Sequence, residues 1–290
     1  MWRFDYPDHA AFVEPALEKA QLWRTVVGFA LVLGTLISLG PLVYSGIFDT
    51  FGPRIDNPNV VVVFAMLFSF VTATLGVFGA LYFVHDRLAA TVFGPWKLVM
   101  DNFIKVCIGI ITLLIMIGIL PPWGYGSPLI VNQEFWPWLM VLPIVLLAVL
   151  VQSSAEEIIF RGYLQQQLGA RFRSPWVWMV VPSVLFALTH YDPQAAGENV
   201  WLIVIWAGFF GAAMADLTAR AGNLGPAIAV HFVNNALALL VVALPDQLGG
   251  AALYLLPFGM SDVEAMRAWM PVDFVTTFVM WLVARLAIRR

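Results

Sequence analysis

The chain has 290 residues, of which 61% are hydrophobic and 11% are charged, and its mean hydropathy is +0.85. Soluble domains are about 45–50% apolar and about 25% charged, so a soluble fold could not bury this much apolar surface. The formal net charge of -3 and the lack of a basic tract or Gly-rich phosphate loop give no indication of a nucleic-acid partner. The single cysteine, Cys107, excludes an internal disulfide and a cysteine metal cluster.

The apolar residues form long unbroken runs, and this pattern selects the fold class. Unpaired backbone groups are not tolerated in lipid, so membrane spans are helices or a closed barrel. Barrel strands alternate polar and apolar residues, which these runs do not. Runs of about 17 to 25 residues match a hydrocarbon core about 30 Å thick. The sequence predicts an all-α, polytopic membrane bundle with eight spans at 24–47, 60–84, 103–120, 138–168, 175–190, 200–219, 225–244 and 271–288.

Turn-forming residues separate these runs. They are Pro53 and Pro58, Gly94 and Pro95, Pro121 and Pro122, Pro193, Gly222, Pro245 and Pro271. The first 23 residues mix acidic and basic side chains, unlike the basic start of a cleavable signal peptide. We therefore expect the amino terminus to be a retained amphipathic lead-in to the first span.

The positions of Lys and Arg predict the orientation of the spans, because cytoplasmic loops retain positive charge. With eight spans, one side holds 13 of the 15 basic residues and the other holds Arg54 and Arg267. The 13 are Arg3, Lys19, Arg24, Arg87, Lys97, Lys105, Arg161, Arg171, Arg173, Arg220, Arg285, Arg289 and Arg290. We expect both termini to be cytoplasmic, in a bacterial inner membrane, with Trp123, Trp136 and Trp138 at the opposite interface.

Ionisable residues inside spans mark candidate functional sites, since each costs about 2.5 to 3.5 kcal/mol to insert. The fourth span carries Glu156, Glu157 and Arg161. Glu157 and Arg161 are four residues apart and can pair along one helix face, while Glu156 points about 100° away. One carboxylate is then neutralised and the other is left free. A purely structural ion pair is the alternative interpretation.

Helix geometry predicts that Glu156 meets His190. If the fourth and fifth spans form an antiparallel hairpin that turns near Arg173, each of these residues lies 17 positions from the turn. At about 1.5 Å per residue, both lie about 25 Å from it and face each other at one level. A histidine at the end of a span can also be an ordinary interfacial residue.

The seventh span carries His231 and Asn235, which are four residues apart and share a helix face. Asn234 lies to the side of that face and is the weaker candidate. This pair could instead be an interhelical hydrogen bond that holds the bundle together. We expect Asp216 and His85 to be structural.

Three motifs in this order resemble the CPBP family, also called the CAAX-protease and bacteriocin-processing or Abi family. They are Glu-Glu-x-x-x-Arg at 156–161, Phe-x-x-x-His at 186–190 and His-x-x-x-Asn at 231–235. The similarity covers residues 138–245. Residues 1–137 then form N-terminal membrane spans and 246–290 a C-terminal loop and last span, all within one integral membrane domain.

The resemblance implies an intramembrane endopeptidase of glutamic type, acting on a membrane-associated peptide or protein such as a CAAX-type or bacteriocin-like substrate. By carry-over, Glu156 is the general base for water and His190 helps to hold that water. His231 and Asn235 stabilise the oxyanion, and Glu157 and Arg161 support the site. These roles suit peptide hydrolysis, which needs a positioned base and donors aimed at a developing oxyanion.

Two questions stay open in the sequence. The first is metal dependence: no cofactor is expected, but Glu156, His190 and His231 could hold a divalent ion, although no His-Glu-x-x-His helix is present and an amide is a poor zinc ligand. The second is the class of protein. A non-catalytic membrane binding or immunity protein could keep the same cavity, and an ion-coupled transporter could use intramembrane acids, although no internal repeat supports it.

Overall fold

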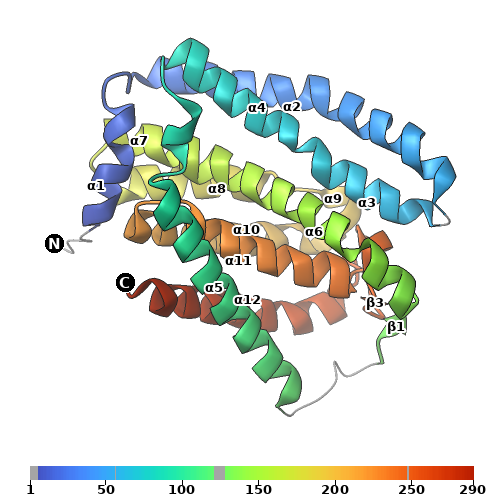
Figure 1. The fold of residues 1–290 in the computed structure, drawn as a ribbon. Coiled ribbons are helices and arrows are strands. Elements are labelled where there is room, and N and C mark those ends of the chain that lie inside the picture. Colours follow the sequence, from blue (N-terminus) through green and yellow to red (C-terminus); the bar gives the residue numbers. More distant parts are fainter. Residues whose placement is uncertain (1–5, 56, 121–127, 247) are drawn as a thin grey trace.

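The computed structural model describes residues 6–55, 57–120, 128–246 and 248–290. It is 81% helical, and its apolar helices confirm the predicted all-α, polytopic membrane bundle of about eight helices. Six helical segments among the described residues have the length and hydropathy of membrane spans. Two shorter apolar helices, Trp176–Leu188 and Gly225–Val241, complete the set of eight. Figure 1 shows these segments lying side by side.

The elements are named in chain order, with α for α-helices, β for strands and η for 3-10 or π segments. They are α1 (Pro7–Val13), η1 (Glu14–Ala16), α2 (Leu22–Phe51), η2 (Gly52–Arg54), α3 (Pro58–Ser69), α4 (Val71–Gly79), η3 (Ala80–Val84), η4 (Ala89–Val92), α5 (Trp96–Ile119), β1 (Ile130–Val131), α6 (Phe135–Glu157), η5 (Ile158–Gln165), α7 (Gln166–Arg171), η6 (Trp176–Val180), α8 (Val181–Leu188), α9 (Pro193–Ala196), η7 (Gly197–Asn199), α10 (Val200–Ala221), α11 (Gly225–Ala236), η8 (Leu237–Val241), β2 (Val242–Ala243), η9 (Gly249–Ala251), β3 (Tyr254–Leu255) and α12 (Val263–Ile288).

Two spans begin at least a full helical turn earlier than the sequence predicted. The predicted break at Pro271 is wrong, because Pro271 lies inside α12. That helix starts at Asp262, whose side-chain Oδ1 accepts a hydrogen bond from the Ala265 backbone N–H at 3.0 Å and caps the helix. Helix α5 begins at Trp96 rather than 103, and its polar first turns carry an ion pair between Lys105 and Asp101 at 2.6 Å. Capping and side-chain pairing thus extend helices into segments whose composition suggests loops.

The fourth span changes its winding at the candidate site. Helix α6 ends at Glu157, and the π segment η5 follows directly before α7 resumes the α-helix. A π turn adds residues to the helical repeat and rotates the side chains that follow it, and such turns are frequent at functional sites. The rotation places every residue of η5 in a buried position.

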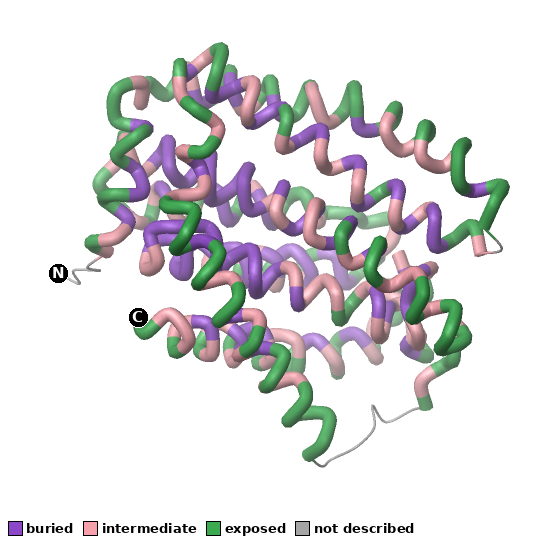
Figure 2. Tube along the Cα trace, viewed as in Figure 1, coloured by how far each residue is buried: buried purple, intermediate pink, exposed green. Residues whose placement is uncertain are grey.

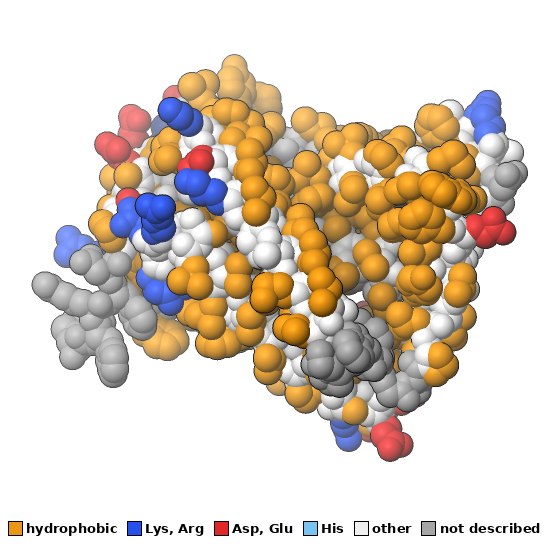
Figure 3. Space-filling view, turned by 60° about the horizontal axis from the view of Figure 1, so that its bottom comes forward, with side chains coloured by type: hydrophobic (Ala, Val, Ile, Leu, Met, Phe, Trp, Pro, Cys, Tyr) orange, Lys and Arg blue, Asp and Glu red, His pale blue; other side chains and the backbone are white. Residues whose placement is uncertain are grey.

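Both chain ends lie at the same end of the bundle (Figure 1), which we call the terminal face. There, Nη2 of Arg290 lies 2.7 Å from Oδ2 of Asp8. In the face drawn in Figure 3, Lys and Arg side chains gather at this end. The placement of both termini on one side of the membrane stays a prediction. Of the residues used in the sequence predictions, Arg3, Pro121, Pro122 and Trp123 lie outside the described residues.

The buried core is centred on η5, α10 and α11 (Figure 2). In α11 every residue from Gly225 to His231 is buried, whereas α2 buries only Thr25, Gly28, Val32 and Gly40. The exposed apolar residues of α2 and α5 face outward, as expected for helices that contact lipid. The segments η5, α10 and α11 are therefore the most enclosed part of the bundle.

A small three-stranded sheet, which the sequence did not suggest, joins three distant segments. β1 pairs antiparallel with β3, and β2 pairs parallel with β3. The Asn132 side chain donates to the backbone carbonyls of Gly249 and Ala252 at 3.0 and 2.7 Å. These bonds tie the segment before α6 to the segment before α12.

The close approach of α2 to η5 generates a packing prediction. A Cβ at Gly28 would overlap the Tyr163 hydroxyl, which is hydrogen-bonded to Nε2 of His85 at 2.9 Å. Gly28→Ala should therefore destabilise the protein by about 1–3 kcal/mol, as overpacking does. Gly34→Ala on the same helix is the matched control, since nothing lies within 4 Å of its added Cβ. Thermal unfolding in detergent checks both, and equal melting temperatures would contradict the described packing.

The packing of α1 generates a prediction about pH. His9 stacks on Trp178 with ring centroids 3.9 Å apart, and burial lowers the pKa of His9 to about 4. The unfolded chain binds a proton near pH 6.5 but the folded chain does not, so stability is lost as pH falls from about 6.5 to 4. His9→Phe keeps the stacking and removes the titration. Its melting temperature should fall less between pH 7 and 4.5, by the equivalent of about 2 kcal/mol; identical pH profiles would contradict the burial of His9.

Candidate active site

The carboxylate of Glu157 and the guanidinium of Arg161 form the predicted ion pair, with Nη1 of Arg161 3.0 Å from Oε1 of Glu157. Both side chains have no exposed surface. Nη2 of Arg161 also donates to the Gly211 carbonyl of α10 at 3.0 Å, and the guanidinium lies 4.8 Å from the centre of the Phe186 ring. A buried pair keeps its charges only with such additional partners.

His231 of α11 lies between the two glutamates. Its Nδ1 is 2.7 Å from Oε1 of Glu157, and its Nε2 is 3.4 Å from Oε2 of Glu156. Because an ionised carboxylate only accepts, the Nδ1–H of His231 donates to Glu157. Glu157 therefore fixes the ring orientation of His231 and directs Nε2 towards Glu156.

Glu156 has surroundings different from those of Glu157. As predicted, it does not share Arg161, and its Oε2 is buried without a hydrogen-bond partner among the described residues. The sequence did not reveal that Nε2 of His231 lies opposite this oxygen. Glu156 is thus without an ion pair to Lys or Arg in the described structure, but it is not isolated.

Asn235 is held by two neighbouring amides. Its Nδ2 donates to Oε1 of Gln152 at 2.9 Å, and its Oδ1 accepts from Nδ2 of Asn234 at 3.2 Å. An amide nitrogen has two hydrogens, so one hydrogen of Asn235 remains for another acceptor. Gln152 was missed in the sequence, although it lies four residues before Glu156 and hence on the same helix face.

His190 follows the end of α8, and its Nδ1 donates to the Phe186 carbonyl at 3.0 Å. A carbonyl oxygen only accepts, so this bond assigns the proton of a neutral imidazole to Nδ1 and leaves Nε2 as an acceptor. The hairpin geometry predicted that His190 faces Glu156. Both residues line the same cavity in the structure.

The candidate residues converge on a cavity of about 50 Å³. It is lined by Gln152, Glu156, Phe186, His190, Trp206, Phe210, His231, Asn234 and Asn235. A water needs about 10–15 Å³ of such volume together with several polar partners, so this cavity has room for water but not for a peptide. Glu157 and Arg161 are not among these lining residues and lie behind them. Trp206 and Phe210 were not predicted, because aromatic residues in a span carry no distinguishing signal.

The indole N–H of Trp206 is a further polar group of this wall. Its Nε1 is buried and has no hydrogen-bond partner among the described residues. Buried indole N–H groups usually find a partner. Trp206, which lines the cavity, therefore carries an available donor in addition to those of the predicted residues.

The predicted metal ligands do not assemble into a metal site. Within the described ranges, no group of three or more His, Cys, Asp or Glu side chains is arranged to hold a metal ion. Of the three named residues, Glu156 and His231 are in contact, and Nδ1 of His190 is used by the Phe186 carbonyl, which leaves only Nε2 of His190 for a ligand. The remaining polar groups of the cavity are amides, which are poor zinc ligands.

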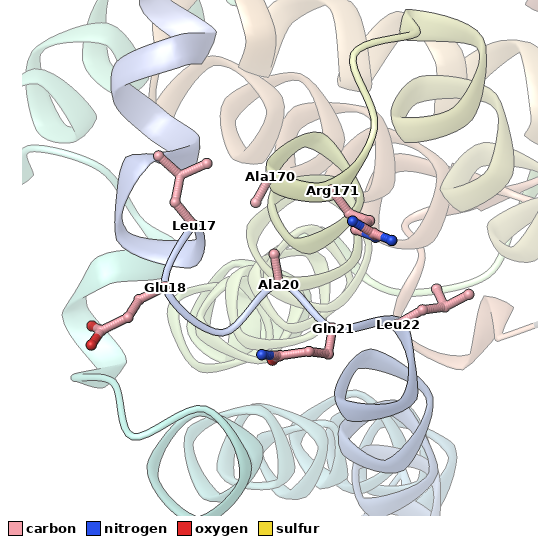
Figure 4. A pocket seen from close by; sticks show the side chains of 7 residues that line it. All are labelled: Leu17, Glu18, Ala20, Gln21, Leu22, Ala170 and Arg171. Carbon is pink, nitrogen blue, oxygen red and sulfur yellow. The ribbon is translucent and has the colours of Figure 1, made fainter.

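A larger cavity, of about 410 Å³, lies at the terminal face and is separate from this site. Figure 4 shows it between the start of α2 and the end of α7, with Glu18 and Arg171 on different sides. The residues that line it include neither histidine nor a pair of carboxylates. Its lining residues thus lack a general base paired with an imidazole, and the smaller cavity is the better candidate for hydrolysis.

Comparisons with known proteins agree with the three motifs. Residues 136–237 match the family model described as type II CAAX prenyl endopeptidase Rce1-like. The chain is also 25% identical to the uncharacterized protein YyaK of Bacillus subtilis (strain 168), over 78% of this chain and 79% of that protein. No solved structure gives a significant match. The resemblance to the CPBP family is confirmed, since residues 136–237, which carry all three motifs, match the Rce1-like endopeptidase model.

Proposed function

We propose that this protein is an intramembrane endopeptidase of glutamic type that hydrolyses a peptide bond in a membrane-associated peptide or protein. The observation that carries the proposal is the convergence of Glu156, His190, His231 and Asn235 on one buried cavity with room for water. The family match supports peptide-bond hydrolysis. The convergence supplies a base and hydrogen-bond donors for it.

Glu156 is proposed as the general base. Its Oε2 has no hydrogen-bond partner among the described residues and can accept a proton from water. Nε2 of His190 is the ring nitrogen left to accept the second hydrogen of that water, since Nδ1 donates to the Phe186 carbonyl. Two acceptors on opposite sides would orient the water oxygen towards a substrate carbonyl.

The oxyanion is proposed to form next to His231 and Asn235. As the water oxygen bonds to the carbonyl carbon, its proton moves to Glu156 and the carbonyl oxygen becomes negative. The free Nδ2 hydrogen of Asn235 would donate to that oxygen, and Nε2 of His231 would also donate when the ring enters the step with a proton on both nitrogens. The C–N bond then breaks, and Glu156 returns the proton to the leaving nitrogen. The unpartnered indole N–H of Trp206 is a further donor for a substrate carbonyl.

Glu157 and Arg161 are proposed as positioning residues. The Glu157 carboxylate accepts from Nδ1–H of His231, and Arg161 stabilises the charge of that carboxylate. This contact fixes the orientation of the His231 ring, with Nε2 facing Glu156. Neither residue needs to contact the substrate.

The substrate is proposed to be of CAAX type or bacteriocin-like, and the family description favours the first. A peptide cannot enter a cavity of about 50 Å³, so binding must widen the site. We propose 138–245 as the catalytic core. The Lys and Arg side chains at the terminal face support cytoplasmic termini. We propose the cell membrane of a bacterium as the location.

Replacing the proposed base is the direct test of this function. Purified protein in detergent is assayed on a fluorogenic peptide library that includes prenylated members, with and without a strong chelator. Glu156→Gln keeps the size of the side chain and removes its basicity, so kcat should fall by about 100-fold or more, the lower range of general-base contributions. Wild-type cleavage should be unchanged by the chelator.

Glu198→Gln is the matched control, because Glu198 is an exposed carboxylate paired with Arg267 at 3.6 Å, outside the cavity. It should retain wild-type activity. Equal activity of Glu156→Gln and wild type would overturn the assignment of the base, and loss of wild-type activity in chelator would replace the glutamic mechanism by a metal-dependent one.

The positioning role of the ion pair predicts a specific pattern in a double-mutant cycle. Arg161→Met leaves the Glu157 carboxylate buried without its guanidinium and should cost about 3–5 kcal/mol. Adding Glu157→Gln removes that charge and should restore most of the melting temperature. Activity should stay low, since His231 has lost its carboxylate partner. Recovery of kcat together with stability would show that the pair is structural only.

A further inference from the structure

A seam of small and polar residues runs from Glu157 to the terminal face between the fourth span and α10. Along one side, Arg161 and Gln165 follow Glu157 at intervals of four residues. Nη2 of Arg161 donates to the Gly211 carbonyl at 3.0 Å, and Nε2 of Gln165 donates to the Ala215 carbonyl at 3.1 Å. Residue numbers increase in the same direction along both segments, from Arg161 to Gln165 and from Gly211 to Ala215. The fourth span and α10 therefore run parallel and keep this register.

Helix α1 covers the end of the seam at the terminal face. A Cβ at Gly169, four residues after Gln165, would lie 2.8 Å from Cε1 of His9. A Cβ at Gly222, at the end of α10, would lie 2.8 Å from the backbone oxygen of Asp8. The two glycines let α1 approach both helices closely. Figure 1 shows α1 beside α7 at this end.

Four buried polar atoms along the seam have no hydrogen-bond partner among the described residues. They are Nε of Arg161, Oε1 of Gln165, Oγ1 of Thr218 and Nε2 of His9. Arg161, Gln165 and Thr218 have no exposed surface, and His9 is 6% exposed. On α10, Thr218 follows Gly211 and Ala215 along one helix face. Buried polar atoms are rarely left unpaired, and water is their usual partner where protein supplies none.

We propose that this seam binds a file of water molecules that connects the terminal face with the buried Arg161 and supplies the hydrolytic reaction. The proposal rests on the proposed function, because cleavage of each peptide bond consumes one water. The guanidinium of Arg161 lies over the Phe186 ring, which lines the catalytic cavity, so the file ends one side chain from that cavity. Gln165 and Thr218 act as positioning residues for these waters, and α1 closes the outer end.

A dry seam and a hydrated seam predict opposite effects for one substitution. Thr218→Val preserves shape and removes only the hydroxyl. In a dry seam it removes an unsatisfied group, which leaves activity unchanged and raises stability. In a hydrated seam it removes the partner of a water, and kcat should fall about 3- to 10-fold, the effect of one hydrogen bond, with KM unchanged. Thr72→Val is the control, since Thr72 of α4 is a buried threonine whose hydroxyl donates to the Ser69 carbonyl of α3 at 2.8 Å.

Hydroxyl-radical footprinting of the full-length protein in detergent, with radicals generated from water by short X-ray pulses, tests the seam without using peptidase activity. Met214 lies on α10 between Gly211 and Thr218 and has no exposed surface, and Met280 of α12 is a matched methionine with 2% exposure. A hydrated seam predicts faster oxidation of Met214 than of Met280, and slower oxidation of Met214 in Thr218→Val. Equal protection of both methionines, or an unchanged kcat in Thr218→Val, would overturn the water file. Inactivity of the wild type would overturn the proposed function and leave the footprint to decide on the seam.

Discussion

The buried centre of this protein depends on the contacts of one oxygen atom, Oε1 of Glu157. This oxygen accepts from Nη1 of Arg161 at 3.0 Å and from Nδ1 of His231 at 2.7 Å, with no exposed surface on the glutamate. A carboxylate buried in a membrane protein is costly unless it is paired, so the two donors must stay in place for the fold to persist. The same pairing connects α6 to α11 and orients the His231 ring. Stability of the bundle and geometry of the candidate site thus depend on one contact.

The surrounding fold separates the chemistry from lipid. Helices α2 and α5 present exposed apolar side chains, whereas α10, α11 and η5 are largely buried, and the polar residues of the site lie at the end of α6, in η5, after α8 and on α11. This arrangement lowers the dielectric around the site and strengthens each hydrogen bond in it. It also restricts access of water and substrate. A catalytic cavity of about 50 Å³ and a polar seam towards the terminal face are consistent with a closed state that must open for a peptide.

Local spacing predicted much of the site, and lateral packing decided the rest. Glu157 and Arg161 pair because residues four apart share a helix face, and counting from the turn at Arg173 brought Glu156 and His190 to one level. The sharing of His231 between two glutamates depends on how α11 is rotated against α6, which no periodicity reveals. The π segment after Glu157 and the small sheet are similar cases, since tertiary contacts select them. Helix α12 passed through Pro271 because capping at Asp262 and burial of Met266 and Met270 favour the longer helix.

The central claim is that a water activated by Glu156 attacks the peptide carbonyl directly. A single-turnover cleavage in ¹⁸O-labelled water, followed by mass spectrometry of the product and of the peptide that contains Glu156, tests it most directly. The account predicts one ¹⁸O atom in the new carboxyl terminus of the product and none in Glu156. Label in the Glu156 carboxylate after one turnover would show attack by the glutamate itself, and would contradict its role as a base.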